Sequence, residues 1–242
     1  MSAFSPLARA VPYPLRSYVK GFWLQSFRWC PPRALAGLEV CVSSGGGVGT
    51  TFLIAHLAKY VRCNDRDDKD RLKHMPALPS RGYGQARFVY VCGDPVEATL
   101  SLIRRSFAVH QARKNGVLRP RLNVADLDGV LRSGPDPLGL TRNLLSWTDA
   151  GAMGPAVMVV RYEKLWDVVP AMAEALGLPE AFVATFPERR ERQTRFDEVP
   201  DPQMQRLREM YAPAYERLEA LGDFKTLRWE AAQKDSNGAV VS

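Results

Sequence analysis

The sequence predicts an α/β protein whose parallel sheet carries helices on both faces, in three α/β/α layers. Short apolar runs rich in valine alternate along the chain with longer segments whose apolar residues recur at helical spacing. This alternation is typical of consecutive βαβ units, which build parallel sheets. The 242 residues are 46% hydrophobic, which is enough for one large buried core.

The predicted elements follow one another in a regular order. Strands are expected at 38–44, 86–93 and 156–165. Helices are expected at 15–29, 50–61, 94–116, 166–179 and 200–222, with two shorter ones within 123–150 and an irregular loop at 62–83. Pro95 in a first turn and Gly116 as a stop frame the helix of 94–116. Ligands of such sheets bind at the carboxyl ends of the strands, so the residues that follow the strands are the candidates for a site.

The chain divides into a basic N-terminal arm (1–37), one domain (38–230) and a tail (231–242) that is expected to be disordered. Residues 1–38 contain five basic residues and no acid, and so carry five of the seven net positive charges. The rest is nearly neutral, unlike the widely basic surface of a nucleic-acid-binding protein, and no nucleic-acid partner is expected. The amphipathic helix at 15–29 either packs on the domain or lies on a membrane surface.

Cysteine usage and hydropathy predict a cytoplasmic protein. The four cysteines form no CxxC pair, and Cys41 and Cys92 fall in strand-like runs, so free thiols in a reducing compartment are expected. No run approaches the ~20 apolar residues of a membrane helix, and the N-terminus lacks the apolar core of a secretory signal. Residues 15–29 are the segment available for a peripheral membrane contact.

The stretch SSGGGVGTTFL (43–53) follows the first strand and opens a helix. This arrangement holds phosphate, because glycines let backbone N–H groups approach an anion and the helix N-terminus adds partial positive charge. Only Gly49 and Thr51 match the nucleotide-hydrolase pattern GxxxxGK[ST], since Ser44 stands at the first glycine and Thr50 at the lysine. The sequence therefore predicts a P-loop-type fold whose loop lacks its own cation.

A different P-loop family fits the chain better. GTTFL resembles the SGTTWL of sulfotransferases, whose loop holds the 5′-phosphosulfate of 3′-phosphoadenosine 5′-phosphosulfate (PAPS). Further stretches are similar to that family in the same order: LKHMPALP (72–79) to its K-T/S-H-L-P segment, ARFVYVCGDPVEATLSL (86–102) to KVVYVARNPKDVAVSY, and VVRYEKLWDVVPAMAEALGLP (159–179) to LRYEDL…FLGLP. LREMYAPAYERLEALG (207–222) more weakly resembles the closing helix of carbohydrate sulfotransferases. The resemblance covers about residues 38–178. It implies sulfuryl transfer from PAPS to a hydroxyl acceptor, such as a carbohydrate or glycolipid, leaving 3′-phosphoadenosine 5′-phosphate (PAP).

The resemblance also implies roles for individual residues. His74 falls at the catalytic histidine, and an imidazole with a pKa near ~6.5 can accept the proton of the acceptor hydroxyl at neutral pH. Lys73, its neighbour, is expected to stabilise the leaving phosphate. The implied PAPS-binding residues are Gly45, Gly46, Gly47, Val48, Gly49, Thr50 and Thr51 in the loop, Ser101 for the 3′-phosphate and Tyr162 for adenine. His56 and His110 fall within predicted helices and are expected to be structural.

Two departures from the family pattern concern its cations. The family's loop lysine would stand at Gly47, and its arginine for the 3′-phosphate would stand at Gly93. We therefore expect basic residues from elsewhere to take these places, with Lys73 at the phosphosulfate end. The candidates for the 3′-phosphate are Arg104, Arg105 and the 189–195 cluster, which includes Arg190 and Arg192. Such charges equally suit a solvated helix face.

Two other functions remain open on the sequence. In a P-loop kinase, Asp94 after the second strand would hold Mg²⁺, and magnesium dependence separates this function from sulfuryl transfer. The other is a binding module that has lost the cations for its cofactor. Glycine at positions 47 and 93, where the family has a lysine and an arginine, favours this function, whereas the presence of His74 and Ser101 argues against it. No metal is expected for sulfuryl transfer, and no His/Cys/carboxylate cluster indicates one.

Overall fold

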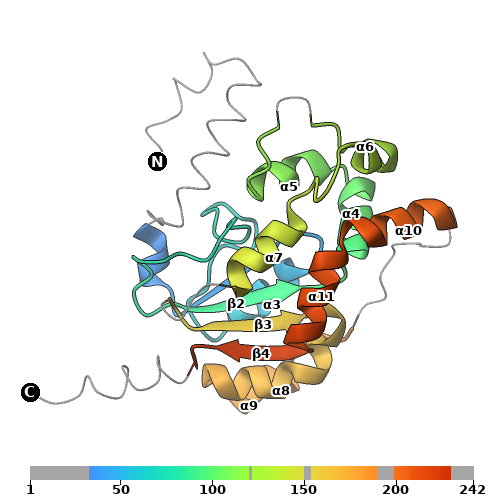
Figure 1. Cartoon of the computed structure of the whole chain (residues 1–242). Helices are drawn as coiled ribbons and strands as arrows, with labels where there is room; N and C mark the ends of the chain where they lie inside the picture. The colour runs from blue at the N-terminus through green and yellow to red at the C-terminus, as the bar shows by residue number, and fades with distance from the viewer. Residues whose placement is uncertain (1–32, 120–121, 150–153, 190–198, 230–242) are drawn as a thin grey trace, which may run out of the picture.

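The computed structural model describes residues 33–119, 122–149, 154–189 and 199–229 (Figure 1). The predicted helix at 15–29 and the tail at 231–242 lie outside the described residues, as do Arg190 and Arg192. Within the described part, the chain is a mixed α/β structure built on one four-stranded sheet with helices packed around it.

The sheet runs in the order β1-β2-β3-β4, and β1 (Val40–Ser43), β2 (Arg87–Cys92) and β3 (Val157–Arg161) are parallel. All three lie inside predicted strands, and nearly all of their residues are buried, which is why continuous apolar runs mark them. The fourth strand, β4 (Phe224–Leu227), pairs with β3 in the antiparallel direction. The prediction of a wholly parallel sheet is wrong for β4, whose FKTL sequence has no buried residue and no apolar run.

Among the described residues, β1 is one of the two edge strands of the sheet, and the irregular loop predicted at 62–83 runs along its outer side. The Asn64 side chain accepts from Val42 N (2.8 Å) and donates to Val42 O (2.9 Å), as a neighbouring strand would. Further along, Ser44 N donates to Lys73 O (3.0 Å). The loop is therefore carried to the carboxyl end of β1, where the glycine stretch begins.

The helices are spread along the chain between and after the strands (Figure 1). The described ones are α3 (Thr50–Leu57), α4 (Pro95–Arg104), α5 (Ala108–Lys114), α6 (Leu127–Arg132), α7 (Leu140–Thr148), α8 (Leu165–Leu176), α9 (Glu180–Ala184), α10 (Asp201–Met210) and α11 (Ala212–Leu221), with short 3₁₀ segments η2 (Arg33–Gly37) and η3 (Tyr162–Lys164). The two short helices predicted within 123–150 are confirmed as α6 and α7.

Two predicted long helices are each divided in the structure. The helix expected at 94–116 is α4 followed by α5, because Ser106 takes a left-handed conformation (φ 56°) that turns the chain between them. The helix expected at 200–222 is α10 followed by α11. Pro213 stands in the first turn of α11 and has no N–H to donate to the preceding helix, so the chain breaks at Tyr211.

Aromatic side chains and a histidine connect helices to the sheet and to one another. Tyr90 of β2 stacks on Trp147 of α7 with ring centroids 5.0 Å apart, and its hydroxyl donates to Asn143 Oδ1 (2.8 Å). Buried His56 of α3 bonds through Nε2 to Phe182 O of α9 (2.9 Å). His56 thus joins two helices, while His110 is an exposed residue of α5.

Candidate functional site

The glycine stretch joins β1 to α3 in a tight left-handed path. Gly46, Gly47 and Gly49 have φ angles of 101°, 79° and 65°. A Cβ at position 47 would lie 2.9 Å from the Cα and the carbonyl oxygen of Ala98, and one at position 49 would lie 2.5 Å from the Tyr162 ring. Both backbone conformation and close packing therefore require glycine, and position 47 has no room for a lysine side chain.

The loop delivers the chain into α3 with an open N-terminus. Gly49 is the N-cap residue and no side chain caps the helix, although Phe52 N reaches back to Gly49 O (3.3 Å). The first-turn N–H groups of such a helix attract an anion, because they point outward and carry partial positive charge. The loop has the backbone form of a phosphate cradle.

The segment with Lys73 and His74 lies directly on this loop. Ser43 Oγ donates to Lys73 O (3.2 Å) and accepts from Met75 N (3.2 Å), in addition to the bond from Ser44 N to Lys73 O. These bonds bring both expected catalytic residues to the carboxyl end of β1, although they stand about 30 residues further along the chain.

The Lys73 amine lies at the start of α3. Its Nζ donates to Thr51 Oγ1 (2.6 Å) and to Arg66 O (2.8 Å), and the residue is only 9% exposed. Burial lowers the pKa of Lys73, while the nearby Asp68 carboxylate opposes that effect. A cation from outside the glycine stretch is thus held against the first turn of the helix.

The His74 ring is fixed in the tautomer that a base requires. Nδ1 lies 3.1 Å from Ser44 O and 3.5 Å from Ser44 Oγ; the carbonyl oxygen is the nearer partner and only accepts, which assigns the hydrogen to Nδ1 and the lone pair to Nε2. Burial lowers the pKa of His74 from 6.5 to about 4, and the positive charge of Lys114 acts in the same direction. The imidazole is neutral at pH 7.

Two charged residues that the sequence analysis did not single out complete this region. Lys114, at the end of α5, forms an ion pair with Asp68 Oδ2, and Asp68 Oδ1 accepts from Lys73 N (3.1 Å). Asn115, the next residue along, donates from Nδ2 to Gly45 O (2.9 Å). No spacing in the sequence indicates these contacts, since they join segments 46 and 70 residues apart.

The residues expected at the 3′-phosphate lie on and beyond α4. Ser101 is one helical turn after Ala98, the residue that touches Gly47. Arg105 bonds from Nε to Ser101 O (3.0 Å), and its guanidinium lies 5.9 Å from the Phe107 ring centroid. Arg104 ends α4 as an exposed residue. Arg189, in the basic cluster, lies over the Trp166 ring at 5.7 Å.

A carboxylate occupies the space beside Gly93. A Cβ at position 93 would lie 2.8 Å from Glu163 Oε1 and 3.0 Å from Val48 Cγ1. Glu163 Oε1 accepts from Asp94 N (3.0 Å), so this carboxylate is anchored there. The other oxygen of this carboxylate, Oε2, lies 3.9 Å from Arg161 Nε, so the place of the family's arginine is narrow and holds an acid–base pair.

Aromatic rings flank the other side of the loop. Tyr162, whose ring limits the space at Gly49, meets the Phe52 ring edge-on with centroids 6.5 Å apart. Phe52 in turn stacks on Trp166 (5.5 Å, 18°). All three are partly exposed, and such rings offer apolar faces to a planar base.

The Asp94 carboxylate serves as a helix cap. Oδ1 accepts from Glu97 N (2.8 Å) at the first turn of α4, and Oδ2 accepts from Tyr215 OH (3.0 Å). Within the described residues, no group of three or more His, Cys, Asp and Glu side chains could hold a metal ion. The residue on which the kinase alternative depends is thus engaged with protein groups.

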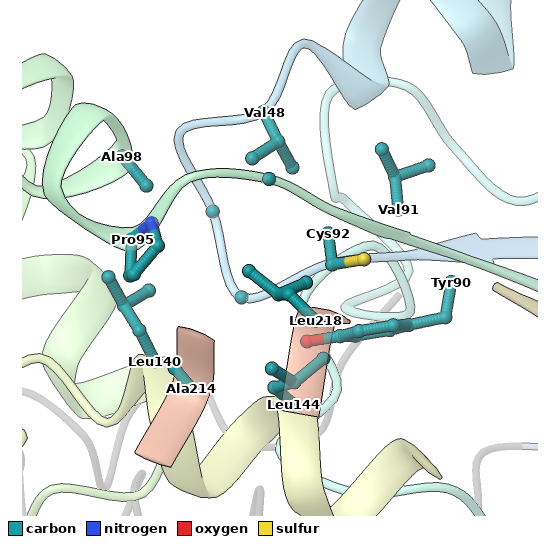
Figure 2. Close-up of a pocket in the computed structure, with 13 residues that line it drawn as sticks. Val48, Tyr90, Val91, Cys92, Pro95, Ala98, Leu140, Leu144, Ala214 and Leu218 are labelled. Atoms are coloured by element: carbon teal, nitrogen blue, oxygen red, sulfur yellow. The ribbon is translucent and has the colours of Figure 1, made fainter. Parts of the chain in front are cut away.

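A small cavity of about 30 Å³ lies under the glycine loop (Figure 2). It is lined by Gly45, Gly46, Val48, Tyr90, Val91, Cys92, Gly93, Pro95, Ala98, Leu140, Leu144, Ala214 and Leu218. Figure 2 shows the apolar side chains of α7 and α11 facing the loop across it. The lining contains no charged side chain, so this cavity does not suit an anion, and the candidate site is instead the part of the loop that Lys73 and His74 contact, at Thr51 and Ser44.

No family model, curated protein or solved structure matches this chain. Among the described residues, no helix is both long and apolar enough to cross a membrane.

Proposed function

We propose that the protein is a PAPS-dependent sulfotransferase acting on a hydroxyl acceptor, with His74 as general base. The observation that carries the proposal is the arrangement of a neutral His74, with its lone pair on Nε2, and the Lys73 amine at the uncapped N-terminus of α3. A base and a cation held beside a phosphate-type loop are the parts that sulfuryl transfer needs. The proposal includes the finer fold, a three-layer P-loop arrangement with helices on both faces.

The residues present fit the phosphosulfate end of PAPS. Gly46 N donates to Ser44 Oγ (3.2 Å), so the backbone N–H groups left for an anion are those from Gly47 onward, and Lys73 adds a charge-assisted donor at the first turn. When bound, PAPS supplies the sulfuryl group, and PAP leaves with the electron pair of the broken S–O bond. His74 Nε2 removes the proton of the acceptor hydroxyl, while Lys73 and the loop amides face the negative charge of the leaving phosphate.

The low pKa of His74 suits a site that receives a polyanion. Burial and two lysines keep the imidazole neutral in the free protein, with a pKa of about 4. Negative charge on the loop favours the protonated ring, so the pKa rises toward the working pH when a phosphosulfate is present. A base matched to neutral pH is then formed only in the complex.

The 3′-phosphate end fits less well, and this favours a second candidate function. The place where the family has an arginine holds the Glu163 carboxylate, with Arg161 on its far oxygen at 3.9 Å, and a carboxylate disfavours a phosphate there. Ser101, Arg104, Arg105 and the basic cluster from Arg189 are the groups left to bind it. If they do not, the chain is a binding module for a smaller sulfated or phosphorylated ligand.

A thermal-shift comparison tests the proposal. PAP should raise the melting temperature without magnesium, because a ligand bound only by the folded state stabilises it by mass action, by ~2.7 kcal/mol at 100 times Kd. Adenosine 5′-phosphosulfate, which lacks the 3′-phosphate, separates the two ends of the site. Stabilisation by ATP–Mg²⁺ alone would instead establish the kinase. PAP binding without turnover of PAPS over a panel of hydroxyl acceptors would favour the binding module.

A further inference from the structure

The end of α5 touches the candidate site at three points. Gln111 packs against Gly46, where a Cβ would lie 2.6 Å from its side chain, and Asn115 donates to Gly45 O (2.9 Å) and Leu138 O (2.9 Å). Lys114, on the same turn, reaches Asp68 in the segment that carries the catalytic candidates. One helix end therefore holds both the glycine loop and the base-bearing segment.

We propose that Asp68 and Lys114 are positioning residues of this site, whose ion pair keeps Lys73 and His74 in register with the glycine loop. Asp68 connects α5 directly to the segment of Lys73 and His74. One of its carboxylate oxygens pairs with the Lys114 amine, and the other accepts a hydrogen bond from Lys73 N (3.1 Å). Neither residue is assigned to contact the acceptor or PAPS. The ion pair can hold Lys73 and His74 in place whatever ligand the site binds. A role of this positioning in catalysis rests on the proposed function.

The ion pair is not needed to attach α5 to the body of the protein. Asn115 and Gln111 already join the helix to the loop, and Ala112 is fully buried in the core. The side chains of Lys114 and Asp68 are only 15% and 9% exposed, and removing such charges from water costs much of what their attraction returns. Asp68 has a left-handed backbone (φ 60°), which aspartate adopts more readily than most residues. A buried ion pair of this kind is better explained by the geometry that it imposes on Lys73 and His74.

The two partners also act on His74 in opposite directions. The groups that set its charge state are Lys114 from α5 and Asp68 and Lys73 from its own segment, together with the Ser44 carbonyl of the loop. The positive charge of Lys114 lowers the pKa of His74, and the negative charge of Asp68 raises it. If the ring stayed in place, loss of Lys114 would therefore raise the pKa of His74 and loss of Asp68 would lower it, whereas a ring released from its buried position would move toward 6.5 in both cases.

Histidine titration by NMR of the full chain tests the proposal, because the protein has only three histidines. Lys114→Met and Asp68→Asn both break the ion pair, so both should raise the pKa of His74 by about one unit, toward 6.5, as the ring is released from its buried position. Lys114→Arg should restore the parent value. His56 serves as an internal reference in every variant, and Lys164→Met, which removes an exposed pair with Asp167, is the matched control and should leave His74 unchanged.

Opposite shifts in the two variants, or no shift in either, would overturn the positioning role, because the ring would then stay in place without the ion pair. If Lys114→Met does not fold, Asp68→Asn still decides the matter by the sign of its shift, with Lys114→Arg as the variant that keeps the pair and the parent value. Should PAP fail to bind the parent protein, the proposed function fails while this titration stays interpretable. With turnover, Lys114→Met should lower kcat about 10- to 100-fold at nearly constant KM, and Lys114→Arg should recover it.

Discussion

The two ends of the candidate site differ in the charges that stand where the family's lysine and arginine are absent. At the start of α3, Lys73 reaches in from another segment and places its amine on Thr51, 2.6 Å away. Beside Gly93, the Glu163 carboxylate lies 3.9 Å from the Arg161 guanidinium, and the other basic residues lie further along α4 and near Trp166. A cation from another segment thus lies at one end of the candidate site, while an acid–base pair occupies the other end.

The largest effect is expected at the proton-transfer end. His74→Ala should reduce turnover by ~10²–10⁴-fold, the usual contribution of a general base, while leaving PAP affinity nearly unchanged. Initial rates with PAPS and PAP titrations on the same preparation measure the two quantities. His110→Ala, an exposed histidine of α5, is the control. Equal rates in His74→Ala and the parent would remove His74 from the mechanism.

Acid stability provides a second, ligand-free test of that end. The pKa of His74 is about 4 in the folded protein against an ordinary value of 6.5. Between pH 6.5 and pH 4, His74 is therefore protonated in the unfolded chain and neutral in the folded one. The free energy of unfolding should therefore fall as pH drops from 6.5 to 4, by up to ~3 kcal/mol from this group. Urea unfolding at several pH values should show a steeper decline for the parent than for His74→Gln. Parallel curves would mean that the imidazole is not held neutral.

Lys73→Met sharpens the comparison of the two ends. The variant loses the charge-assisted donor at the phosphosulfate end, so PAP and adenosine 5′-phosphosulfate should both bind about 10- to 100-fold more weakly. Calorimetric titration measures both ligands, and Lys59→Met, an exposed lysine just after α3, is the control. A loss confined to PAP would place Lys73 at the 3′-phosphate instead and reverse the assignment.

Glu163→Gln should have the smallest effect, and it should strengthen PAP binding where Lys73→Met weakens it. The amide oxygen can still accept from Asp94 N, while the negative charge near the 3′-phosphate disappears. PAP affinity should rise about threefold to tenfold, and the affinity for adenosine 5′-phosphosulfate should stay the same. The same calorimetric titration measures both. Equal gains for both ligands would show that Glu163 does not face the 3′-phosphate, and the contrast between the two ends would then fail.

The sequence predicted strands best where the whole strand is buried, because burial requires a continuous run of apolar residues. Strands β1 to β3 are buried along nearly their whole length and were predicted, whereas half-exposed β4 offers no pattern. The breaks at Ser106 and Tyr211 differ from the predicted continuous helices, because the helical spacing of apolar residues shows neither a left-handed serine nor the point at which a proline begins a new helix. The open glycine loop could be read directly from its residues.

The contacts around the loop show the limit of such inference. The resemblance placed Lys73 and His74 near the glycines, but it could not supply Asp68, Lys114 or Asn115. Their contacts join segments that meet only after the turn at Ser106 redirects α5 toward the loop. Long-range pairs of this kind depend on the three-dimensional path of the chain and not on local spacing.

The Asn64 side chain has a consequence beyond the fold itself. An uncovered edge strand is a template on which other chains can add strands and aggregate. Along the outer side of β1, Val40 N bonds to Arg62 O and both backbone groups of Val42 bond to the Asn64 amide. Each bond satisfies a group that an incoming strand would need. The strand that presents the glycine loop is therefore protected from edge-to-edge association by one carboxamide and a length of irregular chain.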